Sequence, residues 1–497
     1  MMLLLLLIVP FSGGFLALAA QRLGKSAPRI ISLAILLVEL TLACSLLFSG
    51  NHPIRTSFTH AWVPRLGISF HLALDGLSLI LIILTAGIGI AAIASSWSAS
   101  PHRPGFFHGN VLWTIAGIIG VFLAFDLFLF YLLWELMLIP MYFIILLWGD
   151  GSSRAAGIKF IIFTQVSGLF MLLGILVLYF HAGMASGVYS FDYDRLVIHA
   201  RPAGVLWWAM IGFFIACAVK LGIVPFHAWL PDAYCASPPA GGILLGGVMS
   251  KTGAYALLRF MAPLFPVESL SFSRIAMVLG VVSIIYGAAI AIAQTDLKRL
   301  IAYSSISHMG FVLLAIGAWN RLALQGAIVQ IVSHAVIITA LFILADCLEK
   351  RLHTTDMERM GGLWEGAPRM GFAMLLFALA SMGLPGLGSF IGEFLILLGS
   401  FRHSAVITVV AAASGILSVI YALSMMNKVF QGPLSHGRAI PDLSLREAAI
   451  VGLLSAVIIG AGLYPQPIVA TGAAALETLE RAAEPLSTDP PLDGARP

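Results

Sequence analysis

Charged residues are scarce in this chain of 497 residues. Only 10% of its residues are Asp, Glu, Lys or Arg, against about 25% in a typical soluble domain. The mean hydropathy is +1.00, and no polar stretch between the apolar runs is long enough for a separate soluble domain. This composition excludes an ordinary soluble protein and predicts a polytopic membrane protein that has the lipid bilayer as its solvent.

Cysteine is also rare, and the common cofactor motifs are absent. The chain has four cysteines, far apart and without a CxxC pair, which argues against a disulfide framework, a metal site or an iron–sulfur cluster. It has no Walker A sequence, no GxGxxG after a strand and no histidine pair suited to haem. The net charge of +4 is spread over short loops, so a nucleic-acid partner is not expected. We therefore expect no cofactor in this chain and an energy source in an ion gradient or in partner subunits.

The apolar runs predict an all-α fold with about fourteen transmembrane helices. The first run is followed by Arg22, Lys25 and Arg29 and preceded by no positive charge, the reverse of a signal peptide, so it is expected to be the first helix. The predicted spans are 2–20, 29–49, 73–97, 109–124, 126–148, 157–181, 205–229, 240–261, 273–294, 299–318, 322–348, 369–400, 405–430 and 445–466.

Lys and Arg are distributed unequally between the two sides. The side that holds the loop between the first two spans carries 15 of them, and the other side carries 8 in its loops and 2 in the C-terminal tail. The positive-inside rule then places that loop in the cytoplasm and both termini outside. The tail after Pro467 is Ala-rich and then Pro- and Asp-rich, and we expect it to fray.

Two of the predicted spans are interrupted. The seventh contains Gly222 and Pro225, and the twelfth contains Gly383, Pro385 and Gly386. Proline removes a helix hydrogen bond, and freed carbonyls at membrane depth must line a polar cavity or meet protein partners. The breaks lie five spans apart, which predicts two inverted five-helix repeats, spans 4–8 and 9–13, as in many transporters. The expected divisions are 1–108, 109–261 for the first repeat, 273–430 for the second, and 445–497.

Four charged residues lie deep within the spans of the two predicted repeats: Glu135, Lys220, Lys251 and Glu393. A charge at that depth costs at least ~2.5 kcal/mol, so each is a candidate functional residue. Burial disfavours the ammonium form of Lys220, and a nearby carboxylate such as Glu135 favours it, so moving the partner would switch its protonation. The alternatives are a structural ion pair for Glu135, and a Lys220 that only caps helix carbonyls.

Two histidines connect the halves of this set. His308 and His334 lie mid-span in consecutive helices, and an unperturbed pKa of about 6.5 suits proton transfer. A structural role is the equally weighted alternative, and a metal site is disfavoured because no carboxylate or cysteine is near either histidine in sequence. Lys251 is placed to receive a proton from Lys220, and Glu393, just after the second break, to close the path. Glu39 lies outside both repeats and would pair with a neighbouring subunit or face a polar gap.

Several stretches resemble the antiporter-like membrane subunits of respiratory complex I. They are WELMLIPMY at 134–142, VPFHAWLPDA at 224–233, SPPAG at 237–241, SKTGAYALLR at 250–259, DLKRLIAYSSISHMG at 296–310 and PGLGSFIGEF at 385–394. The resemblance covers nearly the whole chain. It departs from the family pattern at Ser237, Pro238 and Pro239, where Ala-Pro-Thr or similar is usual.

This resemblance implies a proton-pumping subunit of NADH:quinone oxidoreductase in a bacterial inner membrane, with no redox chemistry of its own. Glu393 is similar to the M type, because the L and N types, which would be its partners, typically have lysine there. By the same resemblance, Glu135 and Lys220 form the input pair, Lys251, His308 and His334 continue the axis, and Glu393 closes it. The alternatives are a subunit of a multisubunit cation/proton antiporter and a membrane subunit of an energy-converting hydrogenase.

Overall fold

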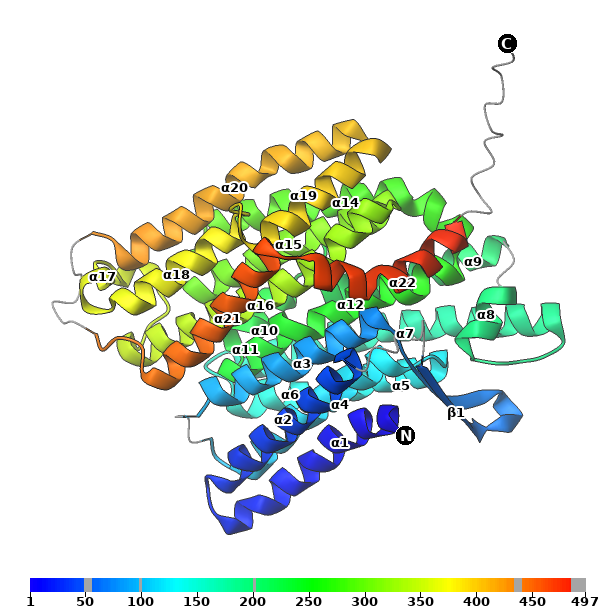
Figure 1. Ribbon diagram of the computed structural model, residues 1–497, viewed down its shortest axis with the longest axis horizontal. Helices are drawn as coiled ribbons and strands as arrows, with labels where there is room; N and C mark the ends of the chain where they lie inside the picture. The colour runs from blue at the N-terminus through cyan, green and yellow to red at the C-terminus, as the bar shows by residue number, and fades with distance from the viewer. Residues whose placement is uncertain (49–55, 98–100, 200–202, 433–439, 484–497) are drawn as a thin grey trace.

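The computed structural model describes residues 1–48, 56–97, 101–199, 203–432 and 440–483. The N-terminal helices (blue) lie along one edge of the molecule and α20, Ala405–Phe430 (orange), lies along the opposite edge (Figure 1). The buried apolar side chains form one continuous core. The predicted all-α membrane fold is confirmed, apart from one short hairpin.

Within the described residues, twelve helical segments are long and apolar enough to cross a membrane. All of them correspond to predicted spans. They are α1 Met2–Ala20, α2 Ala27–Phe48, α3 Gly76–Ser95, α4 Pro104–Leu123, α5 Leu127–Leu136 with α6 Leu138–Trp148, α7 Ser153–Ser186, α9 Gly204–Leu221, α14 Pro266–Ile292, α15 Leu297–Ala318, α16 Arg321–Leu352, α20, and α21 Leu445–Leu463.

The other two predicted spans are present as shorter pieces. The eighth is divided by two π-helical turns into α11 Pro239–Leu244, η3 Leu245–Met249, α12 Ser250–Ala256, η4 Leu257–Met261 and α13 Ala262–Leu264. The twelfth consists of α18 Pro368–Ser381 and α19 Gly388–His403. Single π-helical turns often occur at functional sites, and here one directly precedes Lys251.

Both predicted helix breaks are confirmed. Helix α9 ends at Leu221 because Gly222 has a φ of +77°, a left-handed conformation that favours glycine, and the chain turns before α10, Leu230–Ala236. Between α18 and α19 the break holds Gly383 at φ +72° and Gly386 at φ +94°. The two half-helix ends are thereby placed inside the helical bundle.

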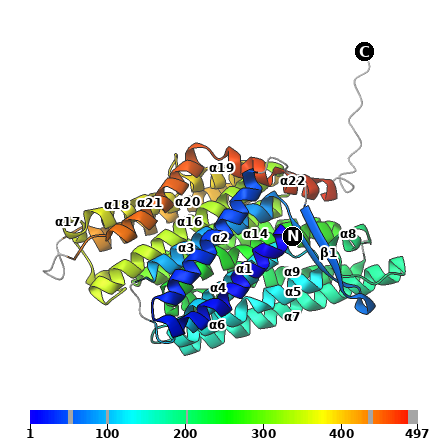
Figure 2. The ribbon, with the colours of Figure 1, turned by 60° about the horizontal axis from the view of Figure 1, so that its bottom comes forward.

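Two aspartates occupy equivalent positions in the two halves. Asp126 caps α5 and forms an isolated antiparallel bridge with Asp192, while Asp296 caps α15 and bridges Asp356. Asp192 directly precedes α8, Tyr193–His199, and Asp356 precedes η5, Met357–Arg359, and α17, Leu363–Gly366. Helices α8 and α17 lie at opposite ends of the molecule in both views (Figure 1, Figure 2). This arrangement supports the inverted repeat, whose limits at 109–261 and 273–430 stay predictions.

A β-hairpin interrupts the helical fold where only a loop was expected. Strands β1, Thr56–Val63, and β2, Ile68–Leu74, pair antiparallel around the short helix η2, Pro64–Leu66. The hairpin lies at the same end as α8 (Figure 2). Gly67 at φ +67° makes the turn, and a Cβ there would lie 2.1 Å from the Tyr189 carbonyl oxygen. The hairpin is therefore fixed against the loop that precedes α8.

The C-terminal segment differs from its prediction. Residues expected to fray after Pro467 instead form α22, Gln466–Ala483, which packs against α16 and α3. The approach is close, because a Cβ on Gly76 of α3 would collide with the Thr471 backbone. Ala475 and Leu476 of α22 are buried, and residues 484–497 lie outside the described part of the chain.

Asp75 lies near the start of the third predicted span, a position that water could reach by sequence alone, but the structure buries it. Asp75 caps α3, is 7% exposed, and forms a buried ion pair with Arg259. The partner lies 184 residues away in sequence. Burial of this pair is tolerated because both charges are matched within the core.

Candidate functional site

Glu135 and Lys220 are brought together in the first half. Glu135 lies in the last turn of α5, and Lys220 lies in the last turn of α9, directly before the break. The two charges interact, yet neither Glu135 oxygen nor Lys220 Nζ has a hydrogen-bond partner among the described residues. Lys220 is only 1% exposed, and its Nζ lies 4.9 Å from the centre of the Trp134 ring. The pair is thus close but not in direct contact.

Helix α7 provides the wall behind Glu135. A Cβ on Gly168 would lie 1.9 Å from Glu135 Oε1, so only glycine leaves room for the carboxylate. Gln165, one turn earlier on α7, lies next to the same carboxylate. These two residues fix where the Glu135 side chain points.

Lys251 lies at the centre of a tighter group. It is fully buried, and its Nζ donates to the Gly246 carbonyl and, over 3.2 Å, to Ser250 Oγ. The same Nζ lies 2.7 Å from His334 Nδ1 on α16. An ammonium donates to a neutral imidazole here, and a neutral amine accepts from a protonated one. The contact therefore permits proton transfer in either direction.

His308 and Glu393 form the second contact of this group. His308 Nδ1 on α15 lies 3.2 Å from Glu393 Oε1 on α19, and Gln330 Nε2 donates to the same oxygen over 3.2 Å. Tyr421 OH on α20 lies 3.2 Å from His308 Nε2. Both ring nitrogens of His308 therefore have partners. Glu393 Oε2 also faces the break, because a Cβ on Gly383 would lie 2.9 Å from it.

Two gaps remain along the predicted path. The rings of His308 and His334 are 5.7 Å apart between centroids, and His334 Nε2 has no hydrogen-bond partner among the described residues. A separation of this size between two polar rings can be bridged by one water molecule bound to both histidines. Lys220 and Lys251 also have no contact with each other in the described part of the chain, so the predicted transfer between them needs an intermediary.

Sequence reasoning missed two partners of His308. Gln330 lies one turn before His334, and a polar residue inside an apolar span is a signal that could have identified it. Tyr421 lies in the middle of a predicted span on a helix distant in sequence, and nothing near it indicated a role. Both are buried and contact His308 directly.

Among the described residues, the group of side chains close enough to hold a metal ion comprises His71, Asp192 and Asp194, at the end of the molecule that carries the hairpin, and includes neither His308 nor His334. There, His71 Nδ1 lies 2.6 Å from Asp192 Oδ2.

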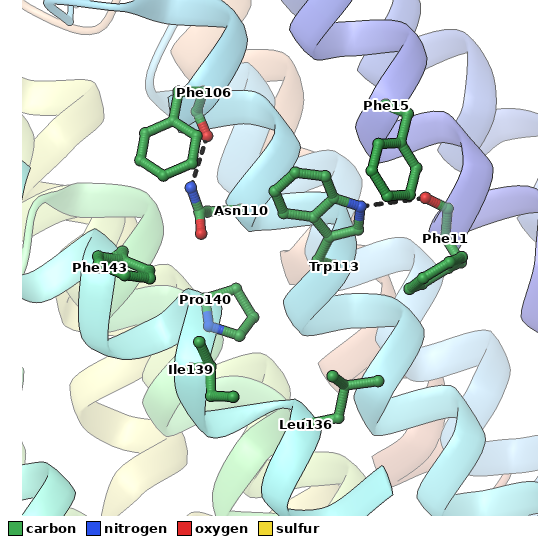
Figure 3. A pocket seen from close by; sticks show the side chains of 9 residues that line it. All are labelled: Phe11, Phe15, Phe106, Asn110, Trp113, Leu136, Ile139, Pro140 and Phe143. Atoms are coloured by element: carbon green, nitrogen blue, oxygen red, sulfur yellow. Dashed lines mark hydrogen bonds between the residues drawn. The ribbon is translucent and has the colours of Figure 1, made fainter.

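An apolar groove of about 230 Å³ lies between α1, α4 and α6 (Figure 3). Its walls contain no Asp, Glu, Lys, Arg or His, and Asn110 donates to the Phe106 carbonyl over 2.7 Å. The groove therefore offers no group for proton transfer and is separate from the buried polar residues.

Comparison with known proteins places the chain among membrane subunits. Residues 124–420 match the family described as NADH:quinone oxidoreductase/Mrp antiporter, TM. Over 493 residues the chain is 45% identical to NADH-quinone oxidoreductase subunit M of Escherichia coli K12, covering 96% of this chain and 97% of that protein. The subunit M of Pseudomonas aeruginosa is also 45% identical, over 492 residues.

Solved structures show the same fold. A chain of respiratory complex I from Thermus thermophilus with bound NADH superposes with a TM-score of 0.88 at 29% identity, covering 97% of this chain and 99% of that chain. A chain of the Mrp complex from Dietzia sp. DQ12-45-1b gives a TM-score of 0.85 at 20% identity, which shows the fold alone.

Proposed function

This chain belongs to the NADH:quinone oxidoreductase/Mrp antiporter family, and from that membership we propose that it is the M-type proton-translocating subunit of an NADH:quinone oxidoreductase. It works beside the L-type and N-type homologues in the membrane arm of that bacterial enzyme. Quinone reduction elsewhere in the complex drives it. We assign it no cofactor, because its part of the reaction is proton transfer only.

The observation that carries this proposal is a line of titratable groups that reaches from one half into the other: Lys251, His334 and His308, which are buried, and Glu393, which is half-buried. Lys251 contacts His334, the two histidine rings face each other, and His308 contacts Glu393. Buried charges are costly, and such a line has no evident structural need in an apolar bundle. Polar groups that pass through the middle of both repeats are what a proton path requires.

The first half acts as the switch. While the Glu135 carboxylate stays near, it stabilises the buried ammonium of Lys220. When Glu135 moves away or takes up a proton, the ammonium is left uncompensated in an apolar site, and its proton is released toward Lys251. The absence of a direct hydrogen bond between the two side chains keeps this separation inexpensive.

The groups from Lys251 onward conduct. Lys251 passes a proton to His334 Nδ1, a bridging water carries one to His308, and His308 passes one to Glu393. Glu393 lies near the start of the half-helix α19 and is the last group of this path.

The test compares two buried carboxylates. Glu135→Gln keeps the shape of the side chain but removes its titration, and Glu39→Gln does the same to a fully buried glutamate on α2, outside both repeats. In inverted vesicles, NADH-driven acidification should fall roughly 100-fold for Glu135→Gln and stay at the wild-type rate for Glu39→Gln. Lys220→Ala should behave like Glu135→Gln. Assembly of the complex is checked on native gels.

Wild-type acidification in vesicles that carry Glu135→Gln or Lys220→Ala would remove that residue from the mechanism. Loss of the NADH-oxidising complex in either variant would be seen on the gel and assigns the defect to assembly instead.

Orientation is a further part of the proposal. The bias of Lys and Arg places both termini on the outer side of the membrane. A reporter enzyme that is active only outside the cytoplasm, fused after Pro497, should be active, and the same reporter fused after Lys25 should be inactive. The opposite pattern would invert the assignment.

A subunit of a cation/proton antiporter without redox partners is the second candidate. The Mrp structure shares the fold at 20% identity, whereas the identity to two subunit M proteins is 45%. Deleting the chain should therefore abolish quinone-linked NADH oxidation in membranes. Deletion that leaves NADH oxidation intact and abolishes salt tolerance would favour the antiporter.

A further inference from the structure

Tyr234 lies beside Gly246 and Ser250, the residues that hold Lys251. It belongs to α10, the short helix after the first break, and is 1% exposed. Its hydroxyl is buried without a hydrogen-bond partner among the described residues. A buried hydroxyl without a partner is costly, so its presence here calls for a function or a bound water.

The surroundings of Tyr234 connect it to Lys251. A Cβ on Gly246 would lie 3.2 Å from Tyr234 Cε2, so the ring packs directly against the glycine whose carbonyl accepts from Lys251. The Tyr234 hydroxyl lies beside Ser250 Oγ, to which Lys251 Nζ donates over 3.2 Å. The hydroxyl is therefore one group away from the lysine.

The other side of Tyr234 faces both the end of α9 and the second half. Trp229, whose ring lies 6.5 Å from that of Tyr234, donates to the Val219 carbonyl over 2.9 Å, beside Lys220. The hydroxyl also lies beside Ser305 on α15, whose Oγ is buried and unpaired among the described residues. Ser305 lies nine residues after Asp296, which caps α15. Glu135 likewise lies nine residues after Asp126, which caps α5.

We propose that the hydroxyls of Tyr234, Ser250 and Ser305 bind one buried water, and that Tyr234 passes protons from the Lys220 side to Lys251. This inference rests on the proposed function. A buried water typically makes about three hydrogen bonds, mainly to polar groups that otherwise lack partners. Here the Tyr234 and Ser305 hydroxyls lack partners among the described residues, and Ser250 Oγ, which donates to the Gly246 carbonyl over 3.2 Å, lies beside them.

The transfer leaves both hydroxyls neutral. A proton that arrives on the water binds the Tyr234 oxygen, and the original Tyr234 proton passes to Ser250 Oγ. Ser250 then releases its own proton to the neutral amine of Lys251, which becomes an ammonium. Each O–H bond that breaks is replaced by a new one, and no other reactant is needed.

Tyr255 on α12 is the matched control. It is equally buried, but its hydroxyl donates to the Phe122 carbonyl over 3.0 Å and lies 3.2 Å from Ser78 Oγ. Removing the Tyr255 hydroxyl leaves the buried Phe122 carbonyl without its donor and costs stability, whereas removing the Tyr234 hydroxyl leaves no protein group unpaired, because its partner is a water. The two Tyr→Phe substitutions therefore have opposite expected effects.

The experiment measures acidification in vesicles and the melting temperature of the purified complex for Tyr234→Phe, Tyr255→Phe and Glu135→Gln. Tyr234→Phe should slow acidification about tenfold with an unchanged melting temperature. Tyr255→Phe should lower the melting temperature by roughly 2 °C with acidification near the wild-type rate. Adding Ser305→Ala to Tyr234→Phe should cause little further loss, because both remove the same water site.

Wild-type acidification in Tyr234→Phe would overturn the inference, as would a slowed rate accompanied by a lower melting temperature. Glu135→Gln separates this failure from failure of the proposed function. If only the Tyr234 inference is wrong, vesicles with the Glu135→Gln complex still fail to acidify. If the proposed function is wrong, those vesicles acidify at the wild-type rate.

Discussion

The two halves of this membrane protein hold their buried charges in different ways. In the first half, Glu135 and Lys220 attract each other, but none of their charged atoms has a hydrogen-bond partner in the described part of the chain. From Lys251 at the end of the first repeat into the second repeat, Lys251, His334, His308 and Glu393 are joined by contacts of 2.7 to 3.2 Å, interrupted between the two histidines.

The difference suits two tasks. An ion pair held apart can change its protonation when one partner moves a short distance, because the attraction between buried charges depends strongly on separation. A hydrogen-bonded line instead fixes its members and lets a proton pass with little movement. The half-helices also differ: Lys220 lies in the last turn of α9, and Glu393 lies near the start of α19.

The largest effect is expected at Lys251, the first group of the hydrogen-bonded series that continues to Glu393. Lys251→Ala should reduce proton translocation roughly 100-fold, because the hydrogen bonds to His334 and Ser250 are both lost. Lys251→Arg keeps the positive charge but effectively never releases its proton, so it should be impaired equally. Acidification in inverted vesicles measures both. A variant with arginine that pumps much better than the alanine variant would show that charge alone matters there.

Glu393 tests the far end of the line. Glu393→Gln keeps a hydrogen-bonding amide beside His308 and Gln330 but removes the titration, and we expect a roughly 100-fold loss with intact assembly. Glu393→Lys keeps a titratable group and should retain part of the activity. Both are measured as protons moved per NADH oxidised. The opposite order, with glutamine active and lysine failing to assemble, would make Glu393 a structural partner only.

Gly168 tests the switch without altering a charged residue. Gly168→Ala places a methyl group where the Glu135 carboxylate lies, and the displaced carboxylate should slow pumping roughly 10- to 100-fold. Gly157→Ala on the same helix is the control, because its Cβ would meet the Tyr142 ring at an ordinary 3.5 Å. Equal vesicle acidification rates in the two variants would show that the position of Glu135 is not critical.

The smallest effect is expected at the histidines, where a gap already exists. His308→Ala or His334→Ala alone should slow pumping by roughly threefold to tenfold, because a water can occupy the space of a lost ring. The double variant should lose more than either single variant. Wild-type acidification in the double variant would assign both histidines a purely structural role.

The sequence was sufficient to predict what depends on local pattern. Apolar runs predicted the spans, and Gly222 and Gly383 predicted the breaks, because glycine and proline act on the backbone where they stand. The hairpin at 56–74 also has a local signal in the sequence, because strand-forming residues lie on both sides of the turn residues Pro64 and Gly67. The Ala-rich start of the tail hid the helical pattern of α22.

Contacts between distant elements could not be predicted in this way. Lys251 and His334 are 83 residues apart, and His308 and Tyr421 are 113 apart. Each contact depends on how several helices pack, which periodicity in one segment does not specify. For the same reason Asp75 looked exposed in the sequence, although Arg259 pairs with it in the core.

The central claim is that the Glu135–Lys220 pair and the series of groups from Lys251 to Glu393 form one proton path. The most direct test measures protons moved per NADH oxidised in proteoliposomes that contain the complex with Lys220→Ala or with Glu393→Gln. One path predicts that both substitutions lower proton translocation to the same residual rate, because either one blocks every proton that passes. A Glu393→Gln complex that pumps at the wild-type rate while Lys220→Ala does not would contradict the claim and place the second half outside the path.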